Sequence, residues 1–200
     1  MASLEDIAKQ VALCTACSLA STRHKTVPGD GPANATIMLI GEAPGFHEDQ
    51  QGHPFVGAAG QFLEQLLASI GLKRSDVFIA NVVKCRPPNN RDPQPDEIGA
   101  CAHFLQAQID TIRPKVIVTL GRFSMAKFFP GEAISRIHGN PRKQGDVIYF
   151  PLYHPAAALH QPALRKTIEE DFRKIPELLA ALEPVPDEPP TESATQLSLF

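Results

Sequence analysis

The residues most able to do chemistry lie in one loop, GEAPGFHEDQQGHPFVG, which runs from Gly41 to Gly57 and directly follows the apolar run TIMLI. Its four glycines let the backbone approach a ligand closely, and its three acidic side chains can act in acid-base or electrostatic catalysis. Phe55 stands between Pro54 and Val56 in the same loop. The loop therefore predicts a site that combines bare backbone, charge and one aromatic side chain.

Four cysteines form a second candidate site: Cys14 and Cys17 in CTAC, Cys85 in VVKCRPPNN, and Cys101 in GACAHF. Disulfides are rare in the reducing cytosol, whereas a CxxC motif with two further thiols suits tetrahedral zinc or an iron–sulfur cluster. The spacing does not choose between these two metals, and four unrelated buried thiols are the remaining alternative. A shared metal site would tie the N-terminal segment to the region around Cys85.

Apolar runs predict the elements that must position these groups. Runs with β-branched residues predict buried strands of a parallel sheet, at 35–40, 77–83, 115–120 and 147–152. Segments with helical spacing separate the strands, and further helices are predicted over 162–182 and within 1–20. This order predicts an α/β protein, a three-layer α/β/α domain around a mainly parallel four-stranded sheet.

In this arrangement the informative polar residues fall at the carboxyl ends of the strands. The loop from Gly41 leaves the first strand, and Asn81 lies towards the end of the second. Gly121 follows the third strand, and His154 follows the fourth. Ligands of open α/β sheets bind in the crevice at this edge, so residues far apart in the sequence are expected to form one site.

Composition and charge limit the classes of function. The 200 residues are 43% hydrophobic, which fits one domain over 1–182 followed by a disordered acidic, proline-rich tail at 183–200. No apolar stretch is long enough to span a bilayer and no secretion signal is present, which predicts a cytoplasmic protein. Four of the 22 acidic residues lie in the tail, so 19 basic against 18 acidic residues leave 1–182 at +1. Only local basic clusters are expected to contact phosphates.

Several motifs together carry a family resemblance. GEAPG, GHPFVGAAGQFL, NVVKCRPPNNRDPQPDE, LG and YHPAAAL, with the four cysteines in this order, resemble the family 4 uracil-DNA glycosylases, the iron–sulfur enzymes of bacteria and archaea. The resemblance covers roughly residues 10–175. It implies the uracil-glycosylase fold, a [4Fe-4S] cluster on Cys14, Cys17, Cys85 and Cys101, and a base-excision-repair reaction. In that reaction the bond joining uracil to deoxyribose is hydrolysed and an abasic site remains.

The resemblance also implies roles for individual residues. A base inside a duplex must be extruded into a pocket that stacks on its face and reads its edge. Phe55 would stack on uracil, and the amide of Asn81 would match uracil's O4 and N3–H while disfavouring cytosine. His154 would donate a hydrogen bond to O2 of the departing uracil; a structural histidine is the alternative. Three more residues complete the predicted substrate site, namely Gly41, Ala43 and Gly45.

The predicted DNA contacts lie outside this pocket. Leu159 is the candidate wedge that fills the space left by the extruded base. Arg86 and Arg91 are expected at the DNA backbone, and His138 in SRIHG is expected to contact a phosphate. The cluster is interpreted as a structural clasp that positions the loop around Arg86, with a redox or charge-transfer role as the alternative.

The residue that activates water is left open. The best-known branch of the superfamily has an acidic residue two positions after the first glycine of this motif, where the present chain has Ala43. Glu42 and Glu48 are the remaining candidates in the loop, with Glu42 favoured for contact with the site. Either carboxylate can orient water or stabilise the cationic sugar without accepting a proton.

The C-terminus carries a separate motif. QLSLF ends the tail, and its Gln196, Leu197, Leu199 and Phe200 resemble the short peptide with which bacterial repair and replication proteins bind the sliding clamp. Apolar anchors on a flexible polar tether suit a pocket on a partner. We therefore expect a monomeric protein that binds uracil-containing DNA and the clamp.

Two functions from other classes compete with this interpretation. The first is a catalytically silent module that binds uracil-containing DNA or the clamp, suggested by Ala43 at the acidic position. The second is a redox or zinc protein with four cysteines and no connection to DNA, against which Asn81 and the HPAAAL stretch argue.

Overall fold

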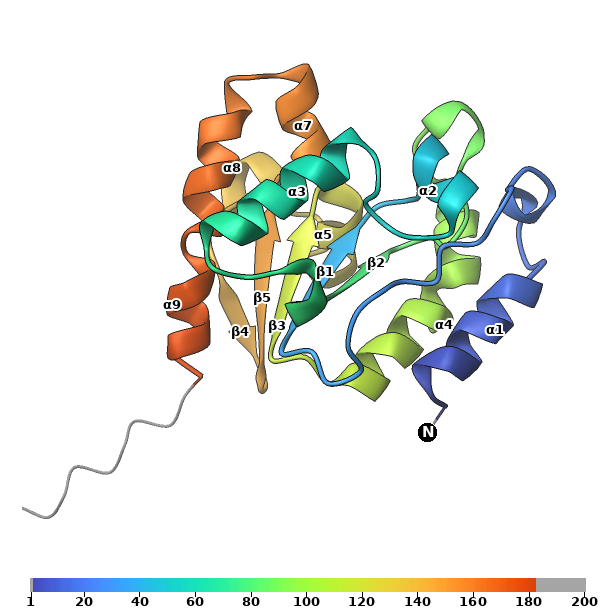
Figure 1. Cartoon of the computed structure of the whole chain (residues 1–200), viewed down its shortest axis with the longest axis horizontal. Helices are drawn as coiled ribbons and strands as arrows, with labels where there is room; N and C mark the ends of the chain where they lie inside the picture. Colours follow the sequence, from blue (N-terminus) through green and yellow to red (C-terminus); the bar gives the residue numbers. More distant parts are fainter. Residues whose placement is uncertain (1, 183–200) are drawn as a thin grey trace, which may run out of the picture.

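A computed structural model describes residues 2–182; Met1 and residues 183–200 lie outside the described part of the chain. Its middle layer is a five-stranded sheet in the order β2-β1-β3-β5-β4 (Figure 1). Four strands pair in parallel, and β4 pairs antiparallel to β5 at one edge. The strands are β1 (Ile37–Gly41), β2 (Val77–Asn81), β3 (Val116–Leu120), β4 (Arg142–Gln144) and β5 (Val147–Leu152).

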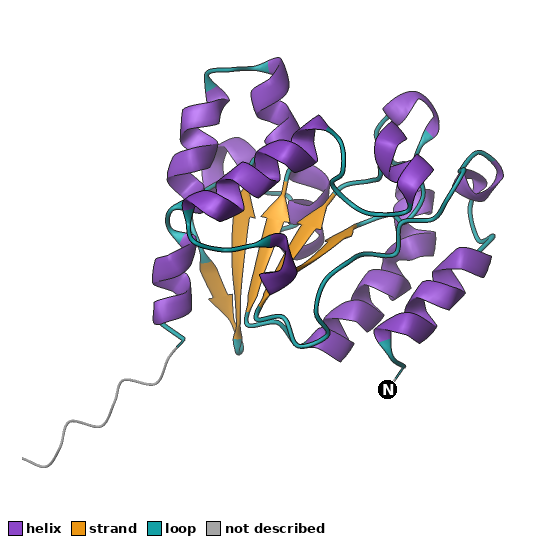
Figure 2. Cartoon of the chain, in the orientation of Figure 1, coloured by secondary structure: helices purple, strands orange, loops and turns teal. Residues whose placement is uncertain are grey.

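Helices cover both faces of the sheet (Figure 2). Because both faces are covered, β1, β2 and β3 are buried along their whole length, as expected for parallel strands. The helices are α1 (Leu4–Leu13), α2 (Phe46–Gln51), α3 (Ala58–Ser69), α4 (Pro95–Ile112), α5 (Arg122–Phe128), α6 (Ile134–Ile137), α7 (Pro155–His160), α8 (Leu164–Phe172) and α9 (Ile175–Ala180).

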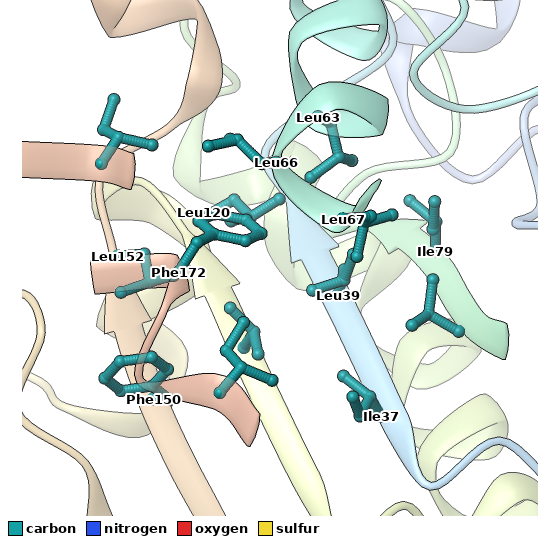
Figure 3. Packing of buried hydrophobic residues seen from close by; sticks show 14 of the residues in the cluster. Ile37, Leu39, Leu63, Leu66, Leu67, Ile79, Leu120, Phe150, Leu152 and Phe172 are labelled. Carbon is teal, nitrogen blue, oxygen red and sulfur yellow. The ribbon is translucent and has the colours of Figure 1, made fainter. Parts of the chain in front are cut away.

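The alternation of side chains along each strand divides the core into two layers. Leu39 of β1 faces α3 and α8, where Leu63, Leu66, Leu67 and Phe172 pack against it (Figure 3). The neighbouring Met38 and Ile40 point to the opposite face, where they join side chains of α1 and α4. Burial of these two apolar layers holds the sheet between its helices and fixes the positions of its strand ends.

The sheet confirms the predicted fold class and adds one strand. The four predicted strands lie within a few residues of their expected bounds. The fifth strand, β4, consists of three exposed residues, RKQ, so it contains no apolar pattern from which a strand could be predicted. This short edge strand forms by pairing with β5, and apolar runs in the sequence do not indicate it.

Two helical predictions also differ in detail. The single helix expected over 162–182 is two helices, α8 and α9. Pro176 occupies the first turn of α9, where it has no N–H to donate to the carbonyl four residues earlier, so one continuous helix cannot run through it. The loop after β1 contains a short helix, α2, that the glycines and prolines concealed. None of the described helices is long and apolar enough to cross a membrane.

Candidate active site

The carboxyl ends of the strands surround a cavity of about 490 Å³. The loop after β1, the start of α3, the end of β2 with its following loop, and α7 supply its walls. Eight of the residues that the sequence singled out line it: Glu42, Ala43, Gly45, Glu48, Phe55, Asn81, Arg91 and His154. The structure thus brings together side chains that lie more than a hundred positions apart in the sequence.

Gly41 allows two of these side chains to meet. It is the last residue of β1 and lies directly opposite Asn81 of β2 in the parallel register. A Cβ atom placed on Gly41 would come within 2.4 Å of Asn81 Oδ1 and 2.8 Å of the Phe55 ring. Only glycine fits at this position, because any side chain would displace both the amide and the aromatic ring.

Asn81 presents an unused hydrogen-bond acceptor in this cavity wall. The residue is 2% exposed, and its Oδ1 atom has no hydrogen-bond partner within residues 2–182. Leaving a buried polar atom unpaired costs about 1–3 kcal/mol, so such atoms are usually paired in native proteins. This oxygen is therefore suited to accept a hydrogen bond from a ligand.

Phe55 is held in an unusual backbone conformation. Its φ is +53°, in the left-handed region that residues other than glycine rarely adopt. Arg74 donates hydrogen bonds to the carbonyls of Pro54 and Phe55, and Gly60 has no side chain to collide with the Phe55 carbonyl, which a Cβ atom would meet at 1.9 Å. These contacts fix the ring at the cavity, because they satisfy the carbonyls that the left-handed turn exposes.

Glu48 secures the same loop from the other side. Its carboxylate accepts hydrogen bonds from the backbone N–H groups of Gly45, Val56 and Gly57, at 3.1, 2.9 and 2.9 Å. The two ends of the loop are thereby joined through one side chain. With three backbone N–H donors on its oxygens, Glu48 is placed to position the loop that carries Phe55.

Glu42 has the contrasting environment. It is half-buried in the cavity wall, and burial together with the charge of Asp92 raises its pKa to about 7, while Arg122 acts in the opposite direction. Arg122 also forms an ion pair with Asp92. Glu42 therefore exchanges its proton near neutral pH, which is the range that a general acid or base requires.

His154 is a neutral hydrogen-bond donor. The backbone N–H of Ala156 donates to its Nδ1 atom at 3.1 Å, so the proton of the neutral ring resides on Nε2. Burial lowers its pKa to about 4, with the charge of Glu48 acting in the opposite direction. Its ring stacks on Phe55, with centroids 5.4 Å apart. Gly121 makes room behind the ring, because a Cβ atom there would lie 3.1 Å from His154 Cβ.

Comparison with known proteins identifies the family to which this chain belongs. The family model of the uracil DNA glycosylase superfamily matches residues 28–179. The chain is 54% identical over 188 residues to a type-4 uracil-DNA glycosylase of Sulfurisphaera tokodaii, covering 89% of this chain and 86% of that protein. The chain belongs to the uracil DNA glycosylase superfamily, among the type-4 enzymes.

Two further type-4 uracil-DNA glycosylases support the same assignment. The protein of Saccharolobus solfataricus is 49% identical over 191 residues, with 90% of this chain and 88% of that protein covered. The protein of Archaeoglobus fulgidus is 48% identical over 193 residues, with 92% and 97% covered. The likeness extends across nearly the whole length of each relative.

The four cysteines of this type-4 chain converge on one small pocket, and all four are free thiols. Arg23 donates a hydrogen bond to Cys85 Sγ at 3.4 Å, and the backbone N–H of Lys84 donates to Cys101 Sγ at 3.3 Å. Burial raises the pKa of Cys101 to about 11 and also raises that of Cys85. Among residues 2–182, no three His, Cys, Asp or Glu side chains lie close enough together to hold a single metal ion.

The cysteine pocket is joined to the cavity through Lys84. This lysine is fully buried, and its Nζ atom donates hydrogen bonds to the Asn81 carbonyl at 2.9 Å and to Gln108 Oε1 at 2.6 Å. Burial lowers its pKa to about 8. Because its own N–H bonds Cys101, Lys84 connects the thiols to the end of β2 that carries Asn81.

The residues predicted to contact DNA differ in their exposure and in whether they already pair with a carboxylate. Leu159 on α7 is 49% exposed, as a wedge requires. Arg91 pairs with both oxygens of the buried Glu97, at 2.9 and 2.6 Å, so its charge is largely neutralised within the protein. Glu97 has its pKa lowered to about 2, chiefly by this pairing. His138 pairs with Asp171 at 2.7 Å and does not line the cavity.

Some residues of the site were missed by the sequence analysis. Arg74 and Lys84 act through hydrogen bonds to the backbone carbonyls of Phe55 and Asn81, and neither residue type nor spacing in the sequence indicates those bonds. Asn90 and Asp92 line the cavity and lie inside the quoted motif NVVKCRPPNNRDPQPDE, so the motif itself was the available signal. Phe46 lies within the glycine- and proline-rich segment expected to be a loop, and it begins α2 instead.

Proposed function

We propose that the protein hydrolyses the N-glycosidic bond between uracil and deoxyribose in DNA and leaves an abasic site, the first step of base excision repair. The observation that carries this proposal is the buried, unpartnered Oδ1 of Asn81 in a cavity that also contains Phe55 and His154. The names of the type-4 relatives support it.

The amide of Asn81 suits the edge of uracil. Its unpaired Oδ1 can accept a hydrogen bond from uracil N3–H, while the amide nitrogen donates to O4. Cytosine offers an acceptor at N3 and a donor at N4, so both bonds would be lost. Phe55 supplies the flat surface against which the base stacks, in a position fixed by Arg74 and Glu48.

A base enters such a cavity only after it has left the stack. Leu159 projects from α7 beside the cavity and is proposed to fill the space that the extruded uracil leaves. Arg86 and the neighbouring loop are proposed to contact the DNA backbone. His138 and Arg91 are weaker candidates for that role because each already pairs with a carboxylate.

Bond cleavage produces an anionic uracil and a cationic sugar, and the side chains meet these charges separately. The Nε2–H of neutral His154 donates to uracil O2, where negative charge gathers as the bond breaks. Glu42, whose pKa is raised to about 7, orients the attacking water or stabilises the sugar cation in its ionised form. We assign Glu48 to positioning of the loop.

We further propose that Cys14, Cys17, Cys85 and Cys101 hold a [4Fe-4S] cluster. Four thiols share one pocket with apolar walls, and N–H groups donate to two of the sulfurs, as is common at iron–sulfur sites. The four thiols share this pocket, yet no three metal-ligating side chains among residues 2–182 lie close enough together for a single ion, which fits a cluster better than one zinc ion. When bound, the cluster would link the end of α1, the loop after β2 and α4 through these cysteines and so act as a clasp for the DNA-contacting loop.

A silent uracil-DNA-binding module is the second candidate function. It is favoured by one observation, the presence of Ala43 where the best-known branch of the superfamily has an acidic residue. The relatives are named as type-4 uracil-DNA glycosylases, and Glu42 lies next to Ala43 in the cavity wall, and on these grounds we place the enzyme first.

The tail is proposed to bind the bacterial sliding clamp through Gln196, Leu197, Leu199 and Phe200, which lie outside the described residues. The composition of QLSLF after a polar tether supports this proposal, since apolar anchors on such a tether fill pockets well.

We expect the purified protein to cleave uracil-containing oligonucleotides, with uracil opposite guanine and in a single strand, and to leave cytosine and thymine oligonucleotides intact. Alkali-sensitive strand cleavage measures the reaction. Asn81→Ala should lower kcat/KM roughly 10²- to 10³-fold, because two hydrogen bonds to uracil are lost. Uracil-dependent DNA binding without cleavage by the wild-type protein would make the silent module the better account.

The roles of the two loop carboxylates, Glu42 and Glu48, should be distinguishable by the pH dependence of kcat/KM. Glu42 has a raised pKa, so its ionised form grows as pH rises through about 7, and wild-type kcat/KM should increase between pH 6 and 8. Glu42→Gln should remove this increase and lower kcat/KM about 10²-fold at pH 8. Glu48→Gln should keep the increase while lowering activity at every pH and reducing Tm. A Glu42→Gln enzyme with the wild-type pH profile would rule out Glu42 as the ionising group.

The cluster predicts about four iron and four sulfide ions per chain, measured by metal and sulfide analysis of the anaerobically purified protein. Cys85→Ala should lower both Tm and the affinity for DNA, since the link between α1 and α4 is weakened. One zinc ion per chain would exclude the cluster. Normal DNA affinity and Tm in Cys85→Ala would show that the site is no clasp.

Deletion of Gln196–Phe200 should abolish binding to the purified bacterial sliding clamp, measured by surface plasmon resonance, and leave uracil excision from short oligonucleotides unchanged. A deletion variant that binds the clamp as tightly as the full chain would refute the role of QLSLF.

A further inference from the structure

Three large hydrophobic side chains are exposed among the described residues: Leu13, Phe46 and Leu159, at 82%, 51% and 49%. Two of them border the cavity. Leu159 lies on α7 next to His160, which lines the cavity, and Phe46 begins α2 directly after Gly45, another lining residue. Figure 1 shows α2 and α7 at the same end of the molecule, beyond the carboxyl ends of the strands. The mouth of the cavity therefore has an exposed apolar side chain on each of two helices.

Phe46 makes no contribution to the described hydrophobic clusters of the core. Its ring is instead supported by Arg86, whose guanidinium carbon lies 5.1 Å from the ring centroid. Arg86 is itself fixed, because its Nε atom donates a hydrogen bond to Asn90 Oδ1 at 2.7 Å. Asn90 also lines the cavity. An aromatic ring and a fixed cation thus lie together at the rim.

An exposed aromatic ring next to a fixed arginine is a combination suited to binding nucleotides. Exposed aromatic rings beside arginines hold unstacked bases in proteins that bind single-stranded nucleic acid, because every base offers a flat face and every nucleotide a phosphate. Extrusion of uracil leaves the adjoining base of the same strand without one of its stacking neighbours. In a duplex that base remains paired with the opposite strand, whereas in a single strand it is free to move onto another surface.

We propose that Phe46, supported by Arg86, is a stacking site for the base next to the extruded uracil in single-stranded DNA. This inference rests on the uracil-excision function proposed above. Phe46 binds the exposed face of that base, and Arg86 attracts its phosphate. Leu159 and Phe46 then have different roles. Leu159 fills the space of the missing base within a duplex, and Phe46 binds a neighbouring base in a single strand, where no opposite strand pairs with that base.

The test measures binding of a single-stranded oligonucleotide that carries 2-aminopurine beside 2′-fluoro-deoxyuridine. The fluorine disfavours the cationic sugar and so keeps the bond intact during the measurement. The chain contains no tryptophan, so the fluorescence of 2-aminopurine is observed without that background. Stacking on Phe46 should change this fluorescence in the wild-type complex.

Phe46→Ala should lower affinity for the single strand about 5- to 100-fold, the range expected for loss of one base–aromatic stack, and should lower affinity for the matching duplex less than about 3-fold. It should also abolish the fluorescence change, and Phe46→Trp should retain the affinity. Leu13→Ala, which removes the most exposed of the three side chains, is the matched control and should leave both affinities unchanged.

Equal losses on single-stranded and duplex DNA in Phe46→Ala, or no loss on either, would overturn the stacking site. Uracil excision by the same proteins separates the two proposals. If the wild type excises uracil and Phe46→Ala has no selective defect, only the stacking site fails. If the wild type neither excises uracil nor prefers it over thymine, the proposed function fails as well.

Discussion

The site depends on the parallel pairing of β1 with β2, which places Gly41 opposite Asn81. Strand pairing fixes this register through the backbone, and the absence of a side chain at Gly41 then lets the Asn81 amide and the Phe55 ring approach each other. Because β1 is an interior strand that pairs with β2 on one side and β3 on the other, burial on both faces leaves it little freedom to shift. The recognition surface is consequently part of the rigid sheet edge, although most of its chemistry comes from loops.

Two charged side chains hold the loop in place at that edge. Arg74 binds carbonyls on one side of Phe55, and Glu48 binds N–H groups on both ends of the loop. Together they stabilise a left-handed conformation at Phe55 that an isolated peptide would rarely adopt. Their hydrogen bonds also explain why the two glutamates differ: Glu48 is occupied by backbone donors, while Glu42 remains in the cavity wall with a raised pKa.

The cysteine pocket anchors the same edge of the sheet through contacts with the end of β2. Lys84 binds Cys101 through its backbone and Asn81 through its ammonium group, so the end of β2 is anchored to the thiols. On the outer side, Glu97 of α4 accepts hydrogen bonds from Arg91 and from Ser18, a neighbour of Cys17. The N-terminal segment, the loop after β2 and α4 are thus connected even without a metal. A cluster at the thiols would reinforce contacts that the protein chain already makes.

The sequence by itself determined the α/β fold class, the four principal strands and the convergence of Gly41, Asn81 and His154 at one edge, because apolar runs and strand order depend on local composition and on general rules of parallel sheets. It also determined the family, since several motifs keep their order and spacing. Tertiary structure alone decided the tautomer of His154, the different roles of Glu42 and Glu48, and the involvement of Arg74 and Lys84. Those properties arise from burial and from hydrogen bonds that depend on the folded backbone around each side chain, and neither exists until the chain has folded.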